Sequence, residues 1–137
     1  VGIIFQSFNL LPSMTALENV NLPNQISGVL VDDKKGIELL KSVGLKKRLN
    51  HYPHQLSGGE QQRVAIARSL ISSPEIIIAD EPTGNLDKRN SEEVMKLIFK
   101  LQSDFASTLI LVTHDETIAK QCNKIIKLDN GLIVKDE

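Results

Sequence analysis

The stretch HQLSGGEQQRVAIARSLISSPEIIIADEPTGNLD, from His54 to Asp87, sets the organisation of the whole chain. Near its start, Ser57, Gly58 and Gly59 precede a segment in which apolar residues recur at helical spacing, so a helix is expected there. Glycines let a backbone approach a ligand closely, and the unpaired N–H groups and dipole of the following helix favour an anion. The pattern therefore predicts an anion site, and phosphate is the usual anion at such a site.

A strand and two carboxylates follow the helix within the same stretch. The apolar run Ile76 to Ala79 predicts a strand that ends at Asp80 and Glu81, where open α/β sheets place their ligands. Adjacent carboxylates can divide their work: one holds Mg²⁺, and the other orients and deprotonates an attacking water. The simpler alternative is a helix-capping loop followed by an exposed acidic turn. The combination, in order and followed by the turn from Pro82 to Asp87, favours the ligand site.

The three motifs closely resemble those of the ATP-binding cassette (ABC) ATPases. LSGGE matches their signature motif, IIIADE their Walker B motif and GNLD their D-loop. The resemblance covers essentially the whole chain. It implies an α/β fold, in which an incomplete P-loop NTPase core sheet is flanked by helices and joined to a helical subdomain that carries the signature motif.

The composition is typical of a globular domain. The chain has 137 residues, of which 41% are hydrophobic and 24% charged, enough for one modest domain with its own core. A net charge of −1 provides no basic surface, so no nucleic-acid partner is expected. The single cysteine, Cys122, excludes an internal disulfide and is expected to be a small buried residue. No apolar run is long enough to span a membrane, so membrane association would require a partner.

The sequence begins inside an apolar strand pattern, VGIIF, with no preceding turn. The phosphate-loop pattern G-x-x-x-x-G-K-[ST] does not occur, and no Gly-Lys pair is present. Because ABC ATPases carry that loop upstream, we expect the sequence to cover roughly the last two-thirds of such a domain. Without the main phosphate cradle and its lysine, this fragment is expected to be inactive as an ATPase on its own.

The same resemblance predicts a gap in the core sheet. The strand that feeds the phosphate loop would lie between the strands expected at 108–113 and 124–128. Its absence would leave open strand edges, which seek pairing. The fragment is therefore expected to be poorly stable or self-associated.

We expect one partial nucleotide-binding domain over residues 1–137. Its helical subdomain, with the signature motif, is expected at about 13–73. The core, with the other motifs, is expected at 1–12 and 74–137.

Three helical segments are predicted before the signature motif. The capping-box spacing from Thr15 to Glu18 starts the first helix, which Pro23 is expected to disturb. Asp32 and Asp33 can cap a second helix that continues through Lys41. Residues 46–52 are expected to form a short basic helical turn whose charges face solvent.

The opening VGIIFQSFNLLPSMTALENVNLP resembles the Q-loop region of the family, especially the subgroup with lipoprotein-releasing and macrolide-exporting ATPases. The resemblance implies that Gln6 contacts Mg²⁺ and the attacking water. A neutral amide suits this role because it can ligate through its carbonyl and donate through its NH₂. An apolar patch follows, and it either meets a helix of a transmembrane partner or folds back onto its own domain. The patch consists of Phe8, Leu10, Leu11 and Pro12.

The rest of the chain predicts a helix, a strand and a hairpin. A long helix is expected from Ser91, and the β-rich run from Thr108 to Thr113 predicts a fully buried strand. A lone histidine at a strand end is more often structural, but the THD at His114 after a Walker B motif resembles the H-loop of the family. Asp115 can cap a short helix to about Cys122, and Asp129-Asn130-Gly131 is a hairpin signal.

Taken together, the resemblance implies the ATP-hydrolysing subunit of a transporter, with ATP and Mg²⁺ bound between two copies paired head to tail. Asp80 would hold Mg²⁺, Glu81 would be the general base, Gln6 would sense metal and water, and His114 would position the γ-phosphate. Asp87 and its turn would link the two sites. The residues that would serve the γ-phosphate from the opposite subunit are Ser57, Gly58, Gly59 and Gln61. The Q-loop region would meet a permease, which would hold the subunit at the cytoplasmic face of the membrane.

Two other functions fit parts of the pattern. One is a soluble cassette ATPase that acts on ribosomes or DNA, although such proteins usually carry two cassettes or a long coiled coil, and neither is present in this sequence. The GNLD that follows ADEPT also favours the exporter-like subgroup. The other is a binding module that has a partner but hydrolyses nothing.

Overall fold

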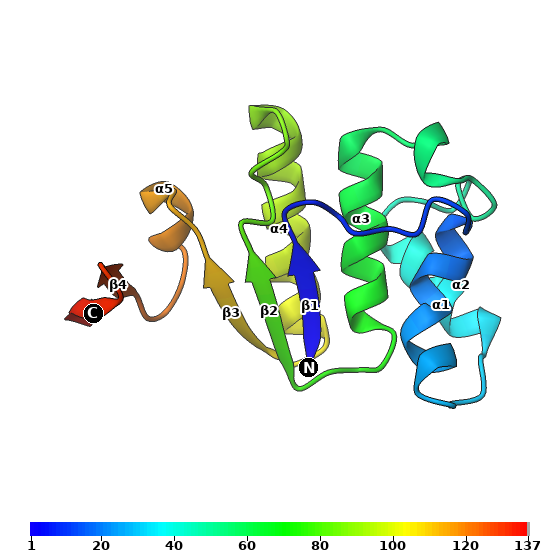
Figure 1. Cartoon of the computed structure of the whole chain (residues 1–137), viewed down its shortest axis with the longest axis horizontal. Coiled ribbons are helices and arrows are strands. Elements are labelled where there is room, and N and C mark those ends of the chain that lie inside the picture. Colours follow the sequence, from blue (N-terminus) through cyan, green and yellow to red (C-terminus); the bar gives the residue numbers. More distant parts are fainter. Residues whose placement is uncertain (137) are drawn as a thin grey trace.

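Three parallel strands form the central sheet of the computed structural model, which describes the backbone of residues 1–136 and the side chains of residues 1–134. The strands are β1 (Gly2–Phe5), β2 (Ile76–Asp80) and β3 (Thr108–Val112), in the order β1-β2-β3 (Figure 1). Gly2 pairs with Ile77, and Asp80 pairs with Val112. All three strands therefore end at the same edge of the sheet.

Helix α3 (Gly58–Leu70) lies at the centre of the helical part of the molecule. It packs against β1, α1 (Ala16–Ile26), α2 (Asp33–Ser42) and α4 (Lys88–Asp104). Its middle is buried nearly all round, because neighbouring elements cover more than one face. The fully buried side chains there are Val64, Ala65, Ile66, Ala67 and Leu70.

Helix α1 begins as predicted, with Thr15 as its N-cap and a complete capping box to Glu18. The prediction that Pro23 disturbs the helix is wrong, because α1 continues through it to Ile26. A proline removes one helical N–H donor, but burial of Ala16 and Val20 against the core compensates for that loss.

Helix α2 is also confirmed: the Asp32 side chain accepts a hydrogen bond from the backbone N–H of Lys34. Gly44, with a φ of +81°, follows its C-terminal end. The helical turn expected at 46–52 is wrong, since these residues form non-helical turns. A short 3₁₀ helix, η1, lies just beyond them at Pro53–Gln55.

Two further predictions need correction. Helix α4 begins at Lys88, three residues before Ser91, because Asp87 already has the extended backbone of an N-cap. The prediction that β3 is fully buried is wrong: its side chains alternate between exposed and half-buried, and Ile110 and Val112 are each 49% exposed. Within residues 1–136, β3 pairs only with β2, so its other edge has no strand to cover it.

The last elements lie beside β3, where β4 and β5 form a second sheet (Figure 1). Asp115 caps a short helix, α5 (Glu116–Ala119), which ends before Cys122. Cys122 is half-buried rather than buried, and burial raises the pKa of its thiol. The predicted hairpin is confirmed as antiparallel strands β4 (Ile126–Asp129) and β5 (Leu132–Asp136). Among the described residues, no helix combines the length and apolar character that crossing a bilayer requires.

The contact between α1 and α2 generates a stability prediction at Gly36. A Cβ there would lie 2.5 Å from Asn21 Oδ1, and Asn21 is buried with its Nδ2 donating to Asp33 Oδ1 at 2.7 Å. Gly36→Ala should lower the free energy of unfolding by about 1–3 kcal/mol through overpacking, despite a gain of up to about 1 kcal/mol in helix propensity. Urea unfolding measures the change.

The matched control adds Asn21→Ala, which removes the clashing amide. In that background Leu17 Cδ1, 2.8 Å from the added Cβ, is the remaining close contact, so Gly36→Ala should cost clearly less than in the unaltered chain. An equal loss in both backgrounds would mean that the Asn21 amide does not restrict residue 36.

Candidate functional site

Polar side chains gather where the three parallel strands end. Gln6 directly follows β1, Asp80 is the last residue of β2, and His114 lies two residues after β3. The register pairs Phe5 with Asp80 and Asp80 with Val112, so these strand ends are level with one another. Open α/β sheets bind their ligands at this edge.

Glu81 has an unusual backbone for its residue type. Its φ is +44°, a left-handed conformation that costs a non-glycine residue about 1–3 kcal/mol. Its N–H donates to the carbonyl of Val112 at 2.9 Å, which holds the start of the turn against the end of β3. Strain of this kind persists where surrounding contacts enforce it, and it clusters at functional sites.

Glu81 and His114 form a hydrogen-bonded pair across the strand ends. Glu81 Oε1 accepts from the backbone N–H of His114 at 2.9 Å, and it lies 2.7 Å from His114 Nδ1. An ionised carboxylate can only accept, so Nδ1 carries the proton. Among residues 1–134, no hydrogen bond reaches Nε2. The hydrogen bond to Glu81 raises the pKa of His114 above its usual value, with the negative charge of Glu81 as the next cause.

The turn after Glu81 holds Gln6 in place. Asn85 Nδ2 donates to the carbonyl of Gln6 at 3.0 Å, and Gln6 Nε2 lies 3.4 Å from Asn85 Oδ1. A Cβ at Gly84 would lie 2.5 Å from Gln6 Nε2, so only glycine permits this close approach. Asn85 is therefore a further candidate residue, which the sequence-based prediction did not single out.

The donor set at this edge fits a hard cation such as Mg²⁺. Asp80 offers an exposed carboxylate, and the hydrogen bond from Gln6 Nε2 leaves the amide oxygen of Gln6 as an acceptor. Residues 1–134 contain no cluster of three or more His, Cys, Asp or Glu side chains that could hold a metal alone. Mg²⁺ keeps several waters and binds through one or two carboxylates plus substrate phosphates, so two protein ligands are enough.

The second group of predicted residues lies at the start of α3. Ser57 Oγ accepts from the N–H of Glu60 at 3.2 Å, while Glu60 Oε2 accepts from the N–H of Ser57 at 2.9 Å. The backbone N–H of Ser57 lowers the pKa of Glu60, and Arg48 forms an ion pair with Glu60 at 3.1 Å. This reciprocal capping box fixes the signature loop and leaves the Ser57 hydroxyl proton available to a ligand. Gln61 Nε2 donates to the carbonyl of Leu56 at 3.2 Å.

The signature glycines contact the D-loop and the start of α4. A Cβ at Gly59 would lie 2.7 Å from Asn90 Oδ1, and one at Gly58 would lie 3.6 Å from Leu86 Cδ2. Asn90 in turn donates a hydrogen bond to Asp87, which lowers the pKa of that carboxyl group. The structure thus brings Asp87 and the signature loop together.

The two groups are separate within one chain. No hydrogen bond among residues 1–134 joins a signature residue to Gln6, Asp80, Glu81 or His114. A cavity of about 460 Å³ lies beside Glu81 and His114, between the D-loop, α4 and α5. Its lining is part polar, with charges of both signs, and part apolar. It includes Lys88, Glu92 and Lys96 as well as Leu86, Met95 and Ile118.

Helix α3 supplies two contacts that the sequence-based prediction missed. Gln62 is fully buried, and its Nε2 donates to the carbonyls of Pro82 and, at 3.4 Å, Phe5. Arg68 donates to the carbonyls of Phe8 and Asn9. Both side chains bond to backbone, which no residue motif encodes. The available signal was a polar Gln62 four positions before the apolar Ile66, the spacing of neighbours on one face of a helix.

The sequence left two alternatives open for the apolar patch of the Q-loop region: it meets a partner, or it folds back onto its own domain. Leu10 packs against the core and Phe8 is half-buried, so part of the patch folds back onto its own domain. Leu11 is 41% exposed and Pro12 is exposed, which leaves the remainder at the surface.

The motifs, their order and the shared sheet edge are those of a nucleotide-binding cassette. The sequence profile of the family described as ABC transporter matches residues 1–84, and the chain belongs to this family.

Known members of the family align with almost the whole chain. It is 52% identical over 137 residues to the macrolide export ATP-binding/permease protein MacB of Chlorobium phaeobacteroides, and the match covers 99% of the chain and 21% of MacB. It is 47% identical to the lipoprotein-releasing system ATP-binding protein LolD of Bacteroides fragilis, covering 98% of the chain and 63% of LolD. The chain therefore spans about a fifth of the MacB protein and three fifths of LolD.

A solved structure shows the same fold. The ATP-binding cassette MJ0796, as a dimer in a post-hydrolysis state bound to ADP and Pi, matches with a TM-score of 0.84 and 44% sequence identity. The match covers 99% of the chain and 61% of that cassette. The predicted fold class is confirmed.

The Glu81–His114 pair generates a titration prediction. The hydrogen bond favours the imidazolium form of His114. Its contribution to folding stability is therefore present below the usual histidine pKa of about 6.5, and it is lost as the pH rises through the raised pKa of His114. In Glu81→Gln, the pKa of His114 should fall back toward about 6.5. An NMR titration of the imidazole protons measures it.

The control is Glu116→Gln, which removes a carboxylate two residues from His114 that makes no hydrogen bond to its ring. It should leave the titration of His114 nearly unchanged. If Glu81→Gln did not lower the pKa, the pair would not exist in solution.

Proposed function

We propose that the chain is the ATP-binding and ATP-hydrolysing part of a transporter subunit, which energises export or release of a substrate. The observation that carries this proposal is the Glu81–His114 pair, at 2.7 Å, beside Asp80 and Gln6 at one edge of a parallel sheet. The names of the relatives LolD and MacB, and their identity to this chain, support a transport role rather than a role on ribosomes or DNA.

Glu81 acts as the general base in this proposal. A base must orient a water and accept its proton as that water attacks the γ-phosphate. Oε1 of Glu81 is occupied by His114, so Oε2 is the oxygen that receives the proton. Glu81 is 23% exposed at its side chain, so water reaches it without full solvation of the carboxylate.

His114 orients this base and binds the phosphate. Its Nδ1 is engaged with Glu81, so Nε2 of the 85% exposed ring is the atom that donates to a γ-phosphate oxygen when the ring is protonated. Asp80 and Gln6 hold Mg²⁺, which neutralises charge on the phosphates when bound.

The signature loop serves a second copy of the chain. Within residues 1–134, the side chains of Ser57 and Gln61 make their hydrogen bonds at the start of α3 and not to the strand-end group, which leaves the signature loop open to a phosphate held by another copy. A head-to-tail homodimer brings the loop of one copy to the strand ends of the other, and the D-loop at Asp87 links the two sites. The dimeric state of MJ0796 supports this arrangement.

A permease completes the transporter. The exposed Leu11 and Pro12 of the Q-loop region form the contact surface for it. Through that contact the subunit lies at the cytoplasmic face of the membrane. Residues 1–137 alone hydrolyse no ATP, because their sequence has no loop of the phosphate-cradling pattern.

The base is tested in a chimera that carries the phosphate-loop segment of LolD upstream of Val1. Glu81→Gln should keep ATP binding, lower turnover by about 10²–10⁴ and trap an ATP-bound dimer, because only the proton acceptor is lost. Phosphate release and gel filtration with Mg²⁺-ATP measure both effects.

Glu92→Gln, on an exposed acid that lines the same cavity, is the control and should leave turnover within about twofold. The 137-residue chain without the added segment should release no phosphate. Near-normal hydrolysis in Glu81→Gln would remove Glu81 from the role.

The signature loop is tested at Gly58. A Cβ there meets only ordinary contacts, 3.6 Å from Leu86 and 3.9 Å from Phe8, so Gly58→Ala should fold and retain most activity. Gly58→Asp adds a negative charge against phosphate, so it should block dimer closure and hydrolysis while ATP affinity of the monomeric chimera stays nearly unchanged.

Equilibrium binding of a fluorescent ATP analogue to the monomer, compared with hydrolysis, decides the assignment. If Gly58→Asp lowered both equally, the signature loop would serve its own chain rather than a partner.

A further inference from the structure

The backbone just after Gln6 is held in a strained shape. Phe8 and Asn9 have φ values of 59° and 51°, so two consecutive non-glycine residues lie in the left-handed region. Asparagine tolerates this region, but it is unfavourable for a bulky aromatic residue. Two local backbone bonds lie within the turn: Phe8 N–H donates to the carbonyl of Phe5 at 3.4 Å, and Asn9 N–H donates to that of Ser7 at 2.6 Å.

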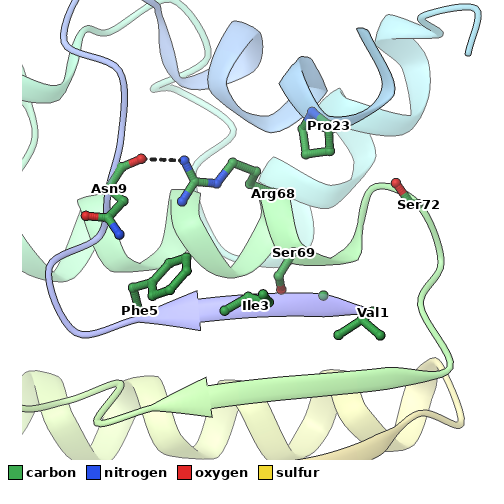
Figure 2. A pocket seen from close by; sticks show the side chains of 9 residues that line it. Val1, Ile3, Phe5, Asn9, Pro23, Arg68, Ser69 and Ser72 are labelled. Atoms are coloured by element: carbon green, nitrogen blue, oxygen red, sulfur yellow. Dashed lines mark hydrogen bonds between the residues drawn. The ribbon is translucent and has the colours of Figure 1, made fainter. Parts of the chain in front are cut away.

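Arg68 binds this strained turn from helix α3. Its Nη2 donates to the carbonyl of Phe8 at 2.8 Å, and its Nη1 donates to the carbonyl of Asn9 at 2.6 Å. Figure 2 shows the guanidinium reaching from α3 to the Asn9 backbone, above Phe5 and beside a cavity of about 240 Å³. The fork of an arginine matches two adjacent carbonyls, and such charge-assisted bonds are strong.

The turn connects the two groups of the candidate site. Gln6 lies at its start, among the strand-end residues, and Phe8 lies near the signature loop, since a Cβ at Gly58 would be 3.9 Å from Phe8 Cζ. Gln62 donates to the carbonyl of Phe5 at 3.4 Å on the other side of Gln6. Helix α3 thus holds the backbone on both sides of Gln6.

We propose that Arg68 is a positioning residue: by bonding both carbonyls it holds Phe8 and Asn9 in the left-handed conformation that places Gln6 at the strand ends and Phe8 against the signature loop. Its effect on ATP turnover rests on the proposed function. Its effect on the turn does not.

The test is amide hydrogen exchange by NMR on the 137-residue chain. Arg68→Lys keeps the charge and most of the stem, but a lysine cannot match the fork geometry. Exchange at the Phe8 and Asn9 amides should rise at least about tenfold, as expected for the loss of one charge-assisted hydrogen bond, with interior α3 amides unchanged. Arg89→Lys, at an 87% exposed arginine of α4, is the control and should change neither region.

A second background separates conformational restraint from packing. Phe8→Gly replaces the residue for which positive φ is unfavourable by one that adopts it without cost, so Arg68→Lys should raise exchange at residues 8 and 9 by less than about threefold there. The proposal is overturned if Arg68→Lys leaves exchange in the turn unchanged. It is also overturned if exchange changes equally in both backgrounds, or rises equally throughout α3.

The chimera provides the catalytic readout. Arg68→Lys should lower ATP turnover several-fold while Arg89→Lys does not. A chimera that hydrolyses no ATP in any form would contradict the proposed function, whereas the exchange experiment would still decide the role of Arg68. If Arg68→Lys altered exchange but left turnover unchanged, Arg68 would affect only the conformation of the turn. That result would overturn the claim that Arg68 positions Gln6 for catalysis.

Discussion

Parallel pairing of β1, β2 and β3 is the constraint on which the rest of the structure depends. Parallel neighbours share a direction, so their last residues meet at one edge. Gln6, Asp80 and His114 reach that edge from positions far apart in the chain, with no local contact needed to bring them together. Parallel strands also require long crossovers, and α1, α2, η1 and α3 occupy the crossover from β1 to β2.

Helix α3 links the strand-end residues to the signature loop. Its buried residues anchor it among β1, α1, α2 and α4, while its polar side chains bond to backbone carbonyls near the site. Gln62 and Arg68 reach the two sides of Gln6, and the first residues of the same helix are the signature loop. One helix therefore bears the signature loop at its start and binds the backbone on both sides of Gln6.

Much of the fold follows from local chemistry in the sequence. Helical spacing predicted α3, capping residues predicted the starts of α1 and α2, and the Asp-Asn-Gly turn predicted the final hairpin. The errors come from tertiary context: packing carries α1 through Pro23, and no described strand covers the outer edge of β3. For the site, strand ends predicted Asp80 and Glu81, and the resemblance to the family added Gln6, but bonds from Arg68 to backbone carbonyls depend on the fold and have no sequence signature.

The long crossover between β1 and β2 also has a consequence during synthesis. Gly2 pairs with Ile77, about 75 residues later, so β1 emerges from the ribosome well before its neighbour exists. At about 5–20 residues per second, that interval lasts roughly 4–15 s. Helices α1 and α2 consist of local contacts and can form in the meantime, whereas the apolar β1 has no β2 to pair with. The nascent chain therefore exposes a hydrophobic strand for seconds, which makes this stretch a candidate for chaperone binding before the sheet closes.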